Sequence, residues 1–199
     1  RRAPNRRGMI GLPKSAMVLA AGLGTRMRPI SDTVPKPLVE IGGRSLLDHA
    51  IDRLALAGVE RVVVNLHYKA EMIAARLAAR GHPRIEISPE DELLETGGGV
   101  LRALPLLGEC FFVVNGDVLW LDGTDQALAR LAGAFDPVRM DAALLLQRTV
   151  TAVGYDGSGD YFLDSLGIPR RRGEREIAPF IFTGVQLLHR RLFDGIAER

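Results

Sequence analysis

Two glycines and several cations follow one another near the start of the chain, in a pattern that could bind phosphate. The segment Leu19–Pro29 reads LAAGLGTRMRP, and Lys36 follows it between two prolines. Backbone N–H groups of a glycine-rich turn after a buried strand can approach a phosphate closely. Arg26 can hold phosphate oxygens with two parallel hydrogen bonds. Because the two prolines restrict the backbone around Lys36, the pattern predicts a phosphate-binding loop with a rigidly mounted cation beside it.

The loop does not match the two most common phosphate motifs. The chain has no G-x-x-x-x-G-K-[ST], and no G-x-G-x-x-G with an acidic residue about twenty positions later. The combination Gly22-x-Gly24, Thr25-Arg26-Met27-x-Pro29 and Pro35-Lys36-Pro37 instead resembles the signature of sugar-1-phosphate nucleotidyltransferases. The resemblance implies that the loop binds the triphosphate of a nucleotide and that Arg26 and Lys36 are catalytic. The nucleotide-binding residues that it implies here are Leu19, Ala20, Ala21, Gly22, Gly24, Thr25 and Arg26.

A carboxylate follows a second apolar segment, in Val113-Val114-Asn115-Gly116-Asp117. Ligands of open parallel sheets bind at the carboxyl ends of the strands, and a hard oxygen ligand there can hold Mg²⁺ together with substrate phosphates. Asn-Gly-Asp is also a common turn sequence, so the residue types alone leave a plain turn open. The family resemblance implies that Asp117 is a ligand of Mg²⁺, the expected cofactor.

The segment Glu92–Gly99 contains three successive glycines, Gly97 to Gly99. Glycine at a helix start costs about 1 kcal/mol per residue relative to alanine, so we expect the missing side chains to leave space for a nucleotide base. The E-T-G-G-G sequence resembles the subgroup of N-acetylmuramate-1-phosphate uridylyltransferases, enzymes of cell-wall recycling. The resemblance implies that Thr96, Gly97 and Gly98 bind the nucleotide, and that UTP is the triphosphate.

The expected sugar site is formed by later segments of the chain. Gly157–Phe162 lies where the family opens its sugar pocket, and Thr183-Gly184 lies in a late strand that we expect to end at the same sheet edge. The expected sugar-binding residues are Asn115, Gly159, Asp160, Thr183 and Gly184. The four histidines are scattered without the spacing of a zinc site. The arginine run Arg170–Arg172 is predicted to be a solvated loop.

Hydrophobic periodicity predicts the elements that position these residues. We expect one α/β domain with a doubly wound, mostly parallel sheet, the Rossmann-like nucleotidyltransferase fold, because strands and helices alternate. The expected strands are 16–19, 61–65, 84–88, 110–114, 140–147 and 180–188. The expected helices are 45–57, 69–80, 97–107 with Thr96 as its N-cap, and 124–134. Residues 155–163 are expected to form a hairpin or lid.

Composition limits the possible classes of protein. The 199 residues are 47% hydrophobic, enough for one domain, and no apolar run is long enough to span a membrane. The net charge is +2, but four arginines in the first seven residues supply +4, so a basic nucleic-acid surface is not predicted. The single cysteine, Cys110, fits a cytoplasmic location. We expect residues 1–13 to be a disordered leader and 14–199 a single nucleotidyltransferase domain. The oligomeric state stays open.

The implied reaction joins a sugar 1-phosphate to UTP with release of pyrophosphate. Alternatives from the sequence are the same chemistry with GTP or dTTP and mannose, heptose or glucose 1-phosphate, or a non-catalytic nucleotide-binding homologue. The chain has Arg26, Lys36 and Asp117, whereas a non-catalytic homologue would be expected to lose the arginine or the lysine. These residues therefore argue against the non-catalytic alternative. Relatives carry a second metal-binding aspartate in a C-terminal W-x-D-x-G-T segment, which these 199 residues do not contain. We therefore expect a C-terminal part of the domain to be missing from this chain.

Overall fold

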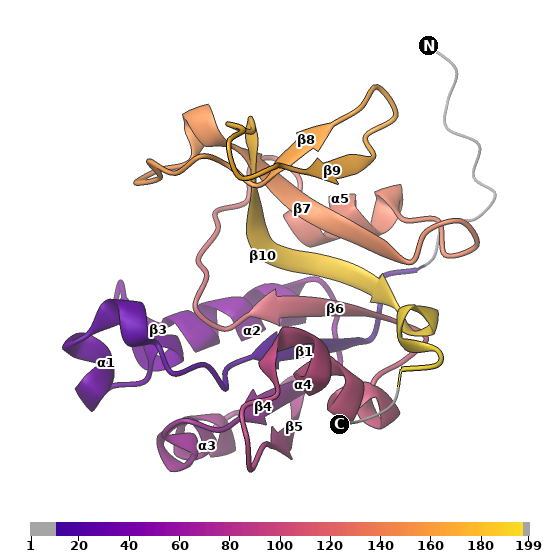
Figure 1. Cartoon of the computed structure of the whole chain (residues 1–199). Helices are drawn as coiled ribbons and strands as arrows, with labels where there is room; N and C mark the ends of the chain where they lie inside the picture. Colours follow the sequence, from indigo (N-terminus) through magenta and orange to yellow (C-terminus); the bar gives the residue numbers. More distant parts are fainter. Residues whose placement is uncertain (1–10, 197–199) are drawn as a thin grey trace.

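A computed structural model describes residues 11–196, which form a central sheet of eight strands with helices on both faces (Figure 1). Four neighbouring strands are parallel, in the order β5-β4-β1-β6. Their bounds are β1 (Ser15–Leu19), β4 (Arg61–Leu66), β5 (Arg84–Pro89) and β6 (Cys110–Asn115). The runs that form β1, β4 and β6 are apolar and largely β-branched or aromatic, as expected of strands buried on both faces.

The sheet continues past β6 with antiparallel strands. The long strand β10 (Phe180–His189) pairs with β6, with β7 (Ala142–Arg148) and with β8 (Tyr161–Leu163). The outermost strand, β9 (Pro169–Arg171), pairs with β8. The pairing of β10 with β7 shifts register between Phe182 and Gln186. Such irregularities re-aim side chains and occur often beside active sites.

The helices lie in two layers. On one face, apolar side chains of α2 (Leu46–Leu56), α3 (Ala70–Ala78) and α5 (Ala127–Ala134) pack into a core with Ala16 and Val18 of β1. On the other face, α4 (Glu95–Ala103) packs against Met17 of the same strand. Successive β1 side chains thus point to opposite faces, and the predicted doubly wound arrangement around a mostly parallel central sheet is confirmed.

The smaller elements surround this framework. Two short strands, β2 (Glu40–Ile41) and β3 (Arg44–Ser45), pair with each other, and α1 (Ile30–Thr33) follows the glycine loop. Five 3₁₀ turns complete the described part of the chain: η1 (Thr25–Met27), η2 (Lys36–Leu38), η3 (Leu104–Leu106), η4 (Thr149–Thr151) and η5 (Arg190–Phe193).

Three elements begin two or three residues away from the expected position. α4 begins at Glu95 after an N-cap at Leu94, so Thr96 lies inside the helix and is not its cap. α5 begins at Ala127 and not at 124, and the Asp122 carboxylate accepts the Ala127 N–H (2.8 Å), one of the first-turn N–H groups that have no partner within the helix. β7 begins at Ala142 and not at 140, because the preceding residues form a turn in which the Met140 N–H donates to the Asp136 carbonyl (2.8 Å).

The expected hairpin region extends further along the chain than 155–163. Its first half forms a loop, and the hairpin itself is β8 with β9. Of the expected leader, residues 1–10 lie outside the described part, and residues 11–13 have no regular structure. Between residues 11 and 196, no helix is long and apolar enough to cross a membrane.

Candidate active site

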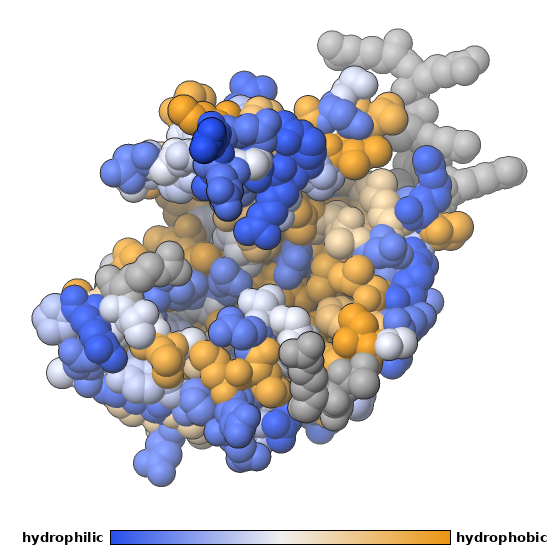
Figure 2. All heavy atoms as spheres, in the orientation of Figure 1, coloured by the Kyte–Doolittle hydropathy of each residue, from blue (hydrophilic) through white to orange (hydrophobic). Residues whose placement is uncertain are grey.

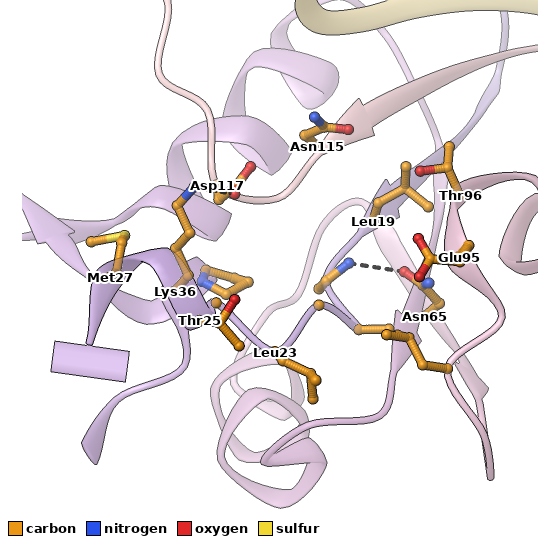
Figure 3. A pocket seen from close by; sticks show the side chains of 16 residues that line it. Leu19, Leu23, Thr25, Met27, Lys36, Asn65, Glu95, Thr96, Asn115 and Asp117 are labelled. Atoms are coloured by element: carbon orange, nitrogen blue, oxygen red, sulfur yellow. Dashed lines mark hydrogen bonds and ion pairs between the residues drawn. The ribbon is translucent and has the colours of Figure 1, made fainter. Parts of the chain in front are cut away.

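A cavity of about 430 Å³ opens where the parallel strands β1, β4 and β6 end (Figure 3). In the space-filling view, the molecule is hollowed between the surface over β8 and β9 and the part built on the parallel strands (Figure 2). This is the edge at which open α/β sheets bind ligands. The lining residues are Leu19, Ala20, Ala21, Gly22, Leu23, Gly24, Thr25, Met27, Lys36, Pro37, Asn65, Leu93, Glu95, Thr96, Asn115 and Asp117.

The glycine loop forms one wall of this cavity. It runs from the end of β1 into η1, where the Met27 N–H donates to the Gly24 carbonyl (2.9 Å). Gly24 has φ +64° and a side chain there would meet Ser31, 3.2 Å from its Cβ, so glycine suits this turn. All the loop residues that we expected to bind the nucleotide line the cavity except Arg26, whose side chain lies outside the described residues.

Lys36 and Asp117 meet at one side of the cavity. The Lys36 ammonium lies 2.5 Å from an Asp117 carboxylate oxygen, and each side chain is a little under one third exposed. Lys36 begins η2 between Pro35 and Pro37, both buried. This packing holds the stem of the lysine, so the two charges predicted independently from the sequence lie at a single point, as Figure 3 shows.

Gly116 explains why Asp117 reaches this point. Its N–H donates to the Leu19 carbonyl (2.8 Å), which ties the turn after β6 to the start of the glycine loop. A Cβ at Gly116 would lie 2.9 Å from that same carbonyl oxygen, closer than real Cβ atoms approach. The glycine therefore allows the metal-ligand candidate Asp117 and the glycine loop to come together.

The residues at this point are compatible with Mg²⁺. Within residues 11–196 no group of three or more histidine, cysteine or acidic side chains forms a ready-made metal cage. Mg²⁺ usually keeps several waters and uses one or two carboxylates together with substrate phosphates, so a single carboxylate facing the cavity fits its chemistry. The role of Asp117 as the ligand stays a prediction.

The start of α4 forms the opposite wall. Leu93, Glu95 and Thr96 line the cavity, and Glu95 has the unusual φ of +57°. Gly97 and Gly98, expected nucleotide ligands, follow in the first turn of α4 and are not among the lining residues. A Cβ at Gly97 would meet nothing within 4 Å, which leaves open space beside that position. Contacts of Gly97 and Gly98 with a nucleotide base stay predictions.

The expected sugar residues divide into two groups. Asn115 lines the cavity, and Gly184 lies against it, since a Cβ there would be 2.7 Å from the Asn115 amide nitrogen. The adjacent Thr183 donates its hydroxyl to the Leu145 carbonyl (2.8 Å). Thus the irregular part of β10 faces the end of β6, and Asn115 and Gly184 are brought together.

Gly159 and Asp160 have structural partners and do not line the cavity. The Asp160 carboxylate accepts the Phe182 N–H (2.8 Å), and the Gly159 carbonyl accepts the Arg172 guanidinium (2.6 Å). A Cβ at Gly159 would lie 2.0 Å from the Ala178 carbonyl oxygen, so only glycine fits. These contacts hold the β8–β9 hairpin against β10, and direct sugar contacts of the pair stay predictions.

Sequence reasoning missed several lining residues. Asn65 was recognised only as the last residue of an expected strand, yet its carboxamide oxygen accepts the Ala20 N–H (2.9 Å) in the glycine loop. An asparagine after three valines was the available signal. Leu23, Met27, Leu93 and Glu95 carried no comparable signal, because their placement depends on loop conformation.

Comparison with known proteins adds the family. A model described as the MobA-like NTP transferase domain matches residues 16–196. The chain belongs to this family. It is 49% identical over 181 residues to an N-acetylmuramate alpha-1-phosphate uridylyltransferase of Caulobacter vibrioides, covering 88% of this chain and 75% of the relative. An enzyme of the same name from Neisseria meningitidis is 38% identical over 187 residues, covering 91% and 78%.

Solved structures of nucleotidyltransferases share the fold. The inositol-1-phosphate CTP transferase of T. maritima aligns with a TM-score of 0.75 at 19% identity, over 92% of this chain and 73% of its own. The predicted resemblance to sugar-1-phosphate nucleotidyltransferases, most of all to N-acetylmuramate-1-phosphate uridylyltransferases, and the predicted Rossmann-like fold are therefore confirmed.

Proposed function

We propose that this nucleotidyltransferase joins N-acetylmuramate α-1-phosphate to UTP, forming UDP-N-acetylmuramate and pyrophosphate. The observation that carries the reaction type is the meeting of Lys36 and Asp117 in a cavity between the glycine loop and the start of α4. The choice of substrates is supported by the similarity to the uridylyltransferases of Caulobacter and Neisseria.

The reaction needs positioning and charge neutralisation more than proton transfer. A phosphate oxygen of the sugar 1-phosphate forms a bond to the α-phosphorus of UTP, while the bond from that phosphorus to the bridging oxygen breaks and pyrophosphate leaves. Since the attacking oxygen is already anionic, no base is required. The Lys36 ammonium would neutralise charge that develops on the α-phosphate, and the glycine loop with Arg26 would hold the triphosphate.

Asp117 would hold Mg²⁺, which when bound would supply positive charge that offsets the negative charge of the substrate phosphates. The carboxylate and the ammonium of Lys36 compensate each other in the free enzyme, which keeps both side chains oriented toward the cavity. Asn115 and the backbone at Gly184 would border the sugar. Thr96 and the start of α4 would border the base. Cys110, a free thiol, is consistent with a reducing, cytoplasmic setting.

Product identification tests the proposal. The protein is incubated with Mg²⁺, UTP and N-acetylmuramate α-1-phosphate, and the products are resolved by mass spectrometry. We expect UDP-N-acetylmuramate and pyrophosphate in equal amounts. A parallel reaction with N-acetylglucosamine 1-phosphate serves as the control for the sugar. Equal or better turnover of that control would overturn the sugar assignment, and no UDP-sugar from either would overturn the use of UTP.

A further inference from the structure

Two buried polar side chains, one of which lines the cavity, form a continuous hydrogen-bonded path. Asn65, at the end of β4, is 3% exposed, and Glu90, just after β5, is 5% exposed. The Asn65 amide nitrogen donates to one Glu90 carboxylate oxygen (2.8 Å). Buried polar groups are costly unless they are paired, so this pair is a feature that the fold maintains and that the proposed chemistry does not use.

The path joins the two walls of the nucleotide cavity. At one end, the Asn65 oxygen accepts the Ala20 N–H of the glycine loop (2.9 Å). At the other end, the second Glu90 oxygen accepts the N–H of Leu94, the residue immediately before α4 (3.1 Å). Two side chains thus connect backbone positions 74 residues apart in the sequence.

Only a carboxylate completes this path. Two N–H donors, from Asn65 and Leu94, converge on Glu90, and each is met by one oxygen. A glutamine of the same shape would offer one acceptor and one donor, so one of the two N–H groups would face another donor. No described lysine or arginine side chain forms an ion pair with Glu90. In its described hydrogen bonds, the Glu90 carboxylate acts as an acceptor of these two N–H groups.

The third glycine of the E-T-G-G-G sequence makes room for the same pair. A Cβ at Gly99 would lie 2.8 Å from a Glu90 carboxylate oxygen and 3.0 Å from the Asn65 amide nitrogen. Gly97 has no neighbour of this kind within 4 Å. Gly99 is therefore required by the Asn65–Glu90 hydrogen bond and not by space for a ligand.

We infer that Asn65 and Glu90 are positioning residues that fix the glycine loop and the start of α4 at one separation, so that a nucleotide is held at its phosphates and its base together. The inference rests on the proposed function in naming a nucleoside triphosphate as the ligand of this cavity. Among the described residues no hydrogen bond joins Asn65 or Glu90 to Asn115 or Gly184. Loss of the pair should therefore weaken nucleotide binding and leave binding of the sugar phosphate largely unchanged.

The Glu90→Gln variant tests this with steady-state kinetics on the intact chain. We expect the KM for UTP to rise about tenfold or more while the KM for the sugar 1-phosphate changes less than about twofold. Asp122→Asn is the matched control, because the Asp122 carboxylate also accepts a backbone N–H at a helix start (Ala127, 2.8 Å) and a second donor, the Arg53 guanidinium (2.7 Å), but does not line the cavity. It should lose comparable stability and keep both KM values.

Amide hydrogen exchange of the unliganded protein gives a readout that needs no substrate. In Glu90→Gln and in Gly99→Ala, the amides of Ala20 and Leu94 should exchange at least about tenfold faster, whereas Gly133→Ala, whose added Cβ meets nothing within 4 Å in α5, should leave them unchanged. Unchanged exchange at both amides in a folded Glu90→Gln protein, or a UTP KM equal to that of the wild type, would overturn the inference. A wild-type protein that does not use UTP, but whose loops still loosen in these variants, would overturn the proposed function and retain the coupling of the two loops.

Discussion

The ammonium of Lys36 lies 2.5 Å from a carboxylate oxygen of Asp117, although Lys36 follows β1, the first strand of the parallel sheet, and Asp117 follows β6, the last. The contact occurs because η2, which begins at Lys36, and the turn after β6 both border the cavity. The cation that we propose to neutralise phosphate and the carboxylate that we propose to hold Mg²⁺ therefore share one location. This relationship makes the cavity a candidate centre for phosphoryl chemistry and gives the first two predictions.

Removing the charge of Lys36 should impair turnover far more than stability. We expect Lys36→Met to reduce kcat at least about 100-fold, because a preorganised charge at the reacting phosphate is lost. The free energy of unfolding should change by no more than about 1 kcal/mol, as for other partly exposed ion pairs. Lys14→Met is the control, since Lys14 also pairs with a carboxylate, that of Glu60 (2.8 Å), on the surface. Equal loss of kcat in both variants would contradict the role of Lys36.

Asp117→Asn should change the response to divalent cation. Replacing the carboxylate by an amide weakens a hard-cation site, so we expect a kcat at least about 100-fold lower and a higher Mg²⁺ concentration for half-maximal rate. Asp122→Asn, five residues later in the same connection, should show the Mg²⁺ dependence of the wild type. The measurement is a Mg²⁺ titration at saturating substrates, and an unchanged midpoint with unchanged rate would exclude Asp117 as the ligand.

Gly184→Ala should disturb the sugar side of the cavity. The added Cβ would lie 2.7 Å from the Asn115 amide nitrogen and must displace that side chain. We expect the KM for the sugar 1-phosphate to rise by about tenfold, with the KM for UTP little changed. Gly195→Ala controls for backbone strain, because Gly195 has φ +76°, close to the +79° of Gly184, but no neighbour within 4 Å. A similar rise in the control would attribute the effect to strain elsewhere.

Asp48 should make the fold sensitive to acid. Burial alone would raise the pKa of this carboxyl, but hydrogen bonds from Arg76, Ser45 and Arg80 outweigh it and hold the pKa below 3.8. The Arg76 and Arg80 contacts, each 2.7 Å, tie α3 and the residues just after it to α2. Because the folded pKa is lowered, the stabilisation is fully present well above pH 4 and is lost as pH falls through the folded pKa.

Denaturant unfolding at two pH values checks this. At pH 7, Asp48→Asn should cost about 3 kcal/mol, as expected when one partner of a buried charged network is removed. The difference between wild type and variant should shrink as pH falls below about 4. A constant difference from pH 7 to pH 3 would show that the Asp48 charge does not stabilise the fold.

Local patterns predicted the parallel core and most of the cavity. Apolar β-branched runs identified β1, β4 and β6, and the glycine loop, Lys36 and Asp117 were recognised from residue types at short spacing. Boundaries were wrong at two helix starts where a carboxylate four or five residues earlier accepts a backbone N–H. Asp122 accepts the N–H of Ala127, at which α5 begins, and Glu90 accepts the N–H of Leu94, the residue before α4.

Contacts between distant segments were beyond sequence reasoning. The Asn65–Glu90 hydrogen bond joins two strands' ends that are 25 residues apart, and no local pattern predicts their register. The sequence likewise grouped Gly97 and Gly98 with the ligand site, while the steric requirement in the structure falls on Gly99. Periodicity reports which face a residue occupies, but not which polar side chains meet beneath a loop.

Pyrophosphate release tests the central claim most directly. The protein is assayed with Mg²⁺ while UTP, dTTP, CTP and GTP are each combined with N-acetylmuramate, N-acetylglucosamine, glucose and mannose 1-phosphates. We predict that UTP with N-acetylmuramate 1-phosphate gives the highest kcat/KM. A different preferred pair would retain the chemistry of Lys36 and Asp117 and replace the substrates. No release with any pair, from folded protein, would contradict the account.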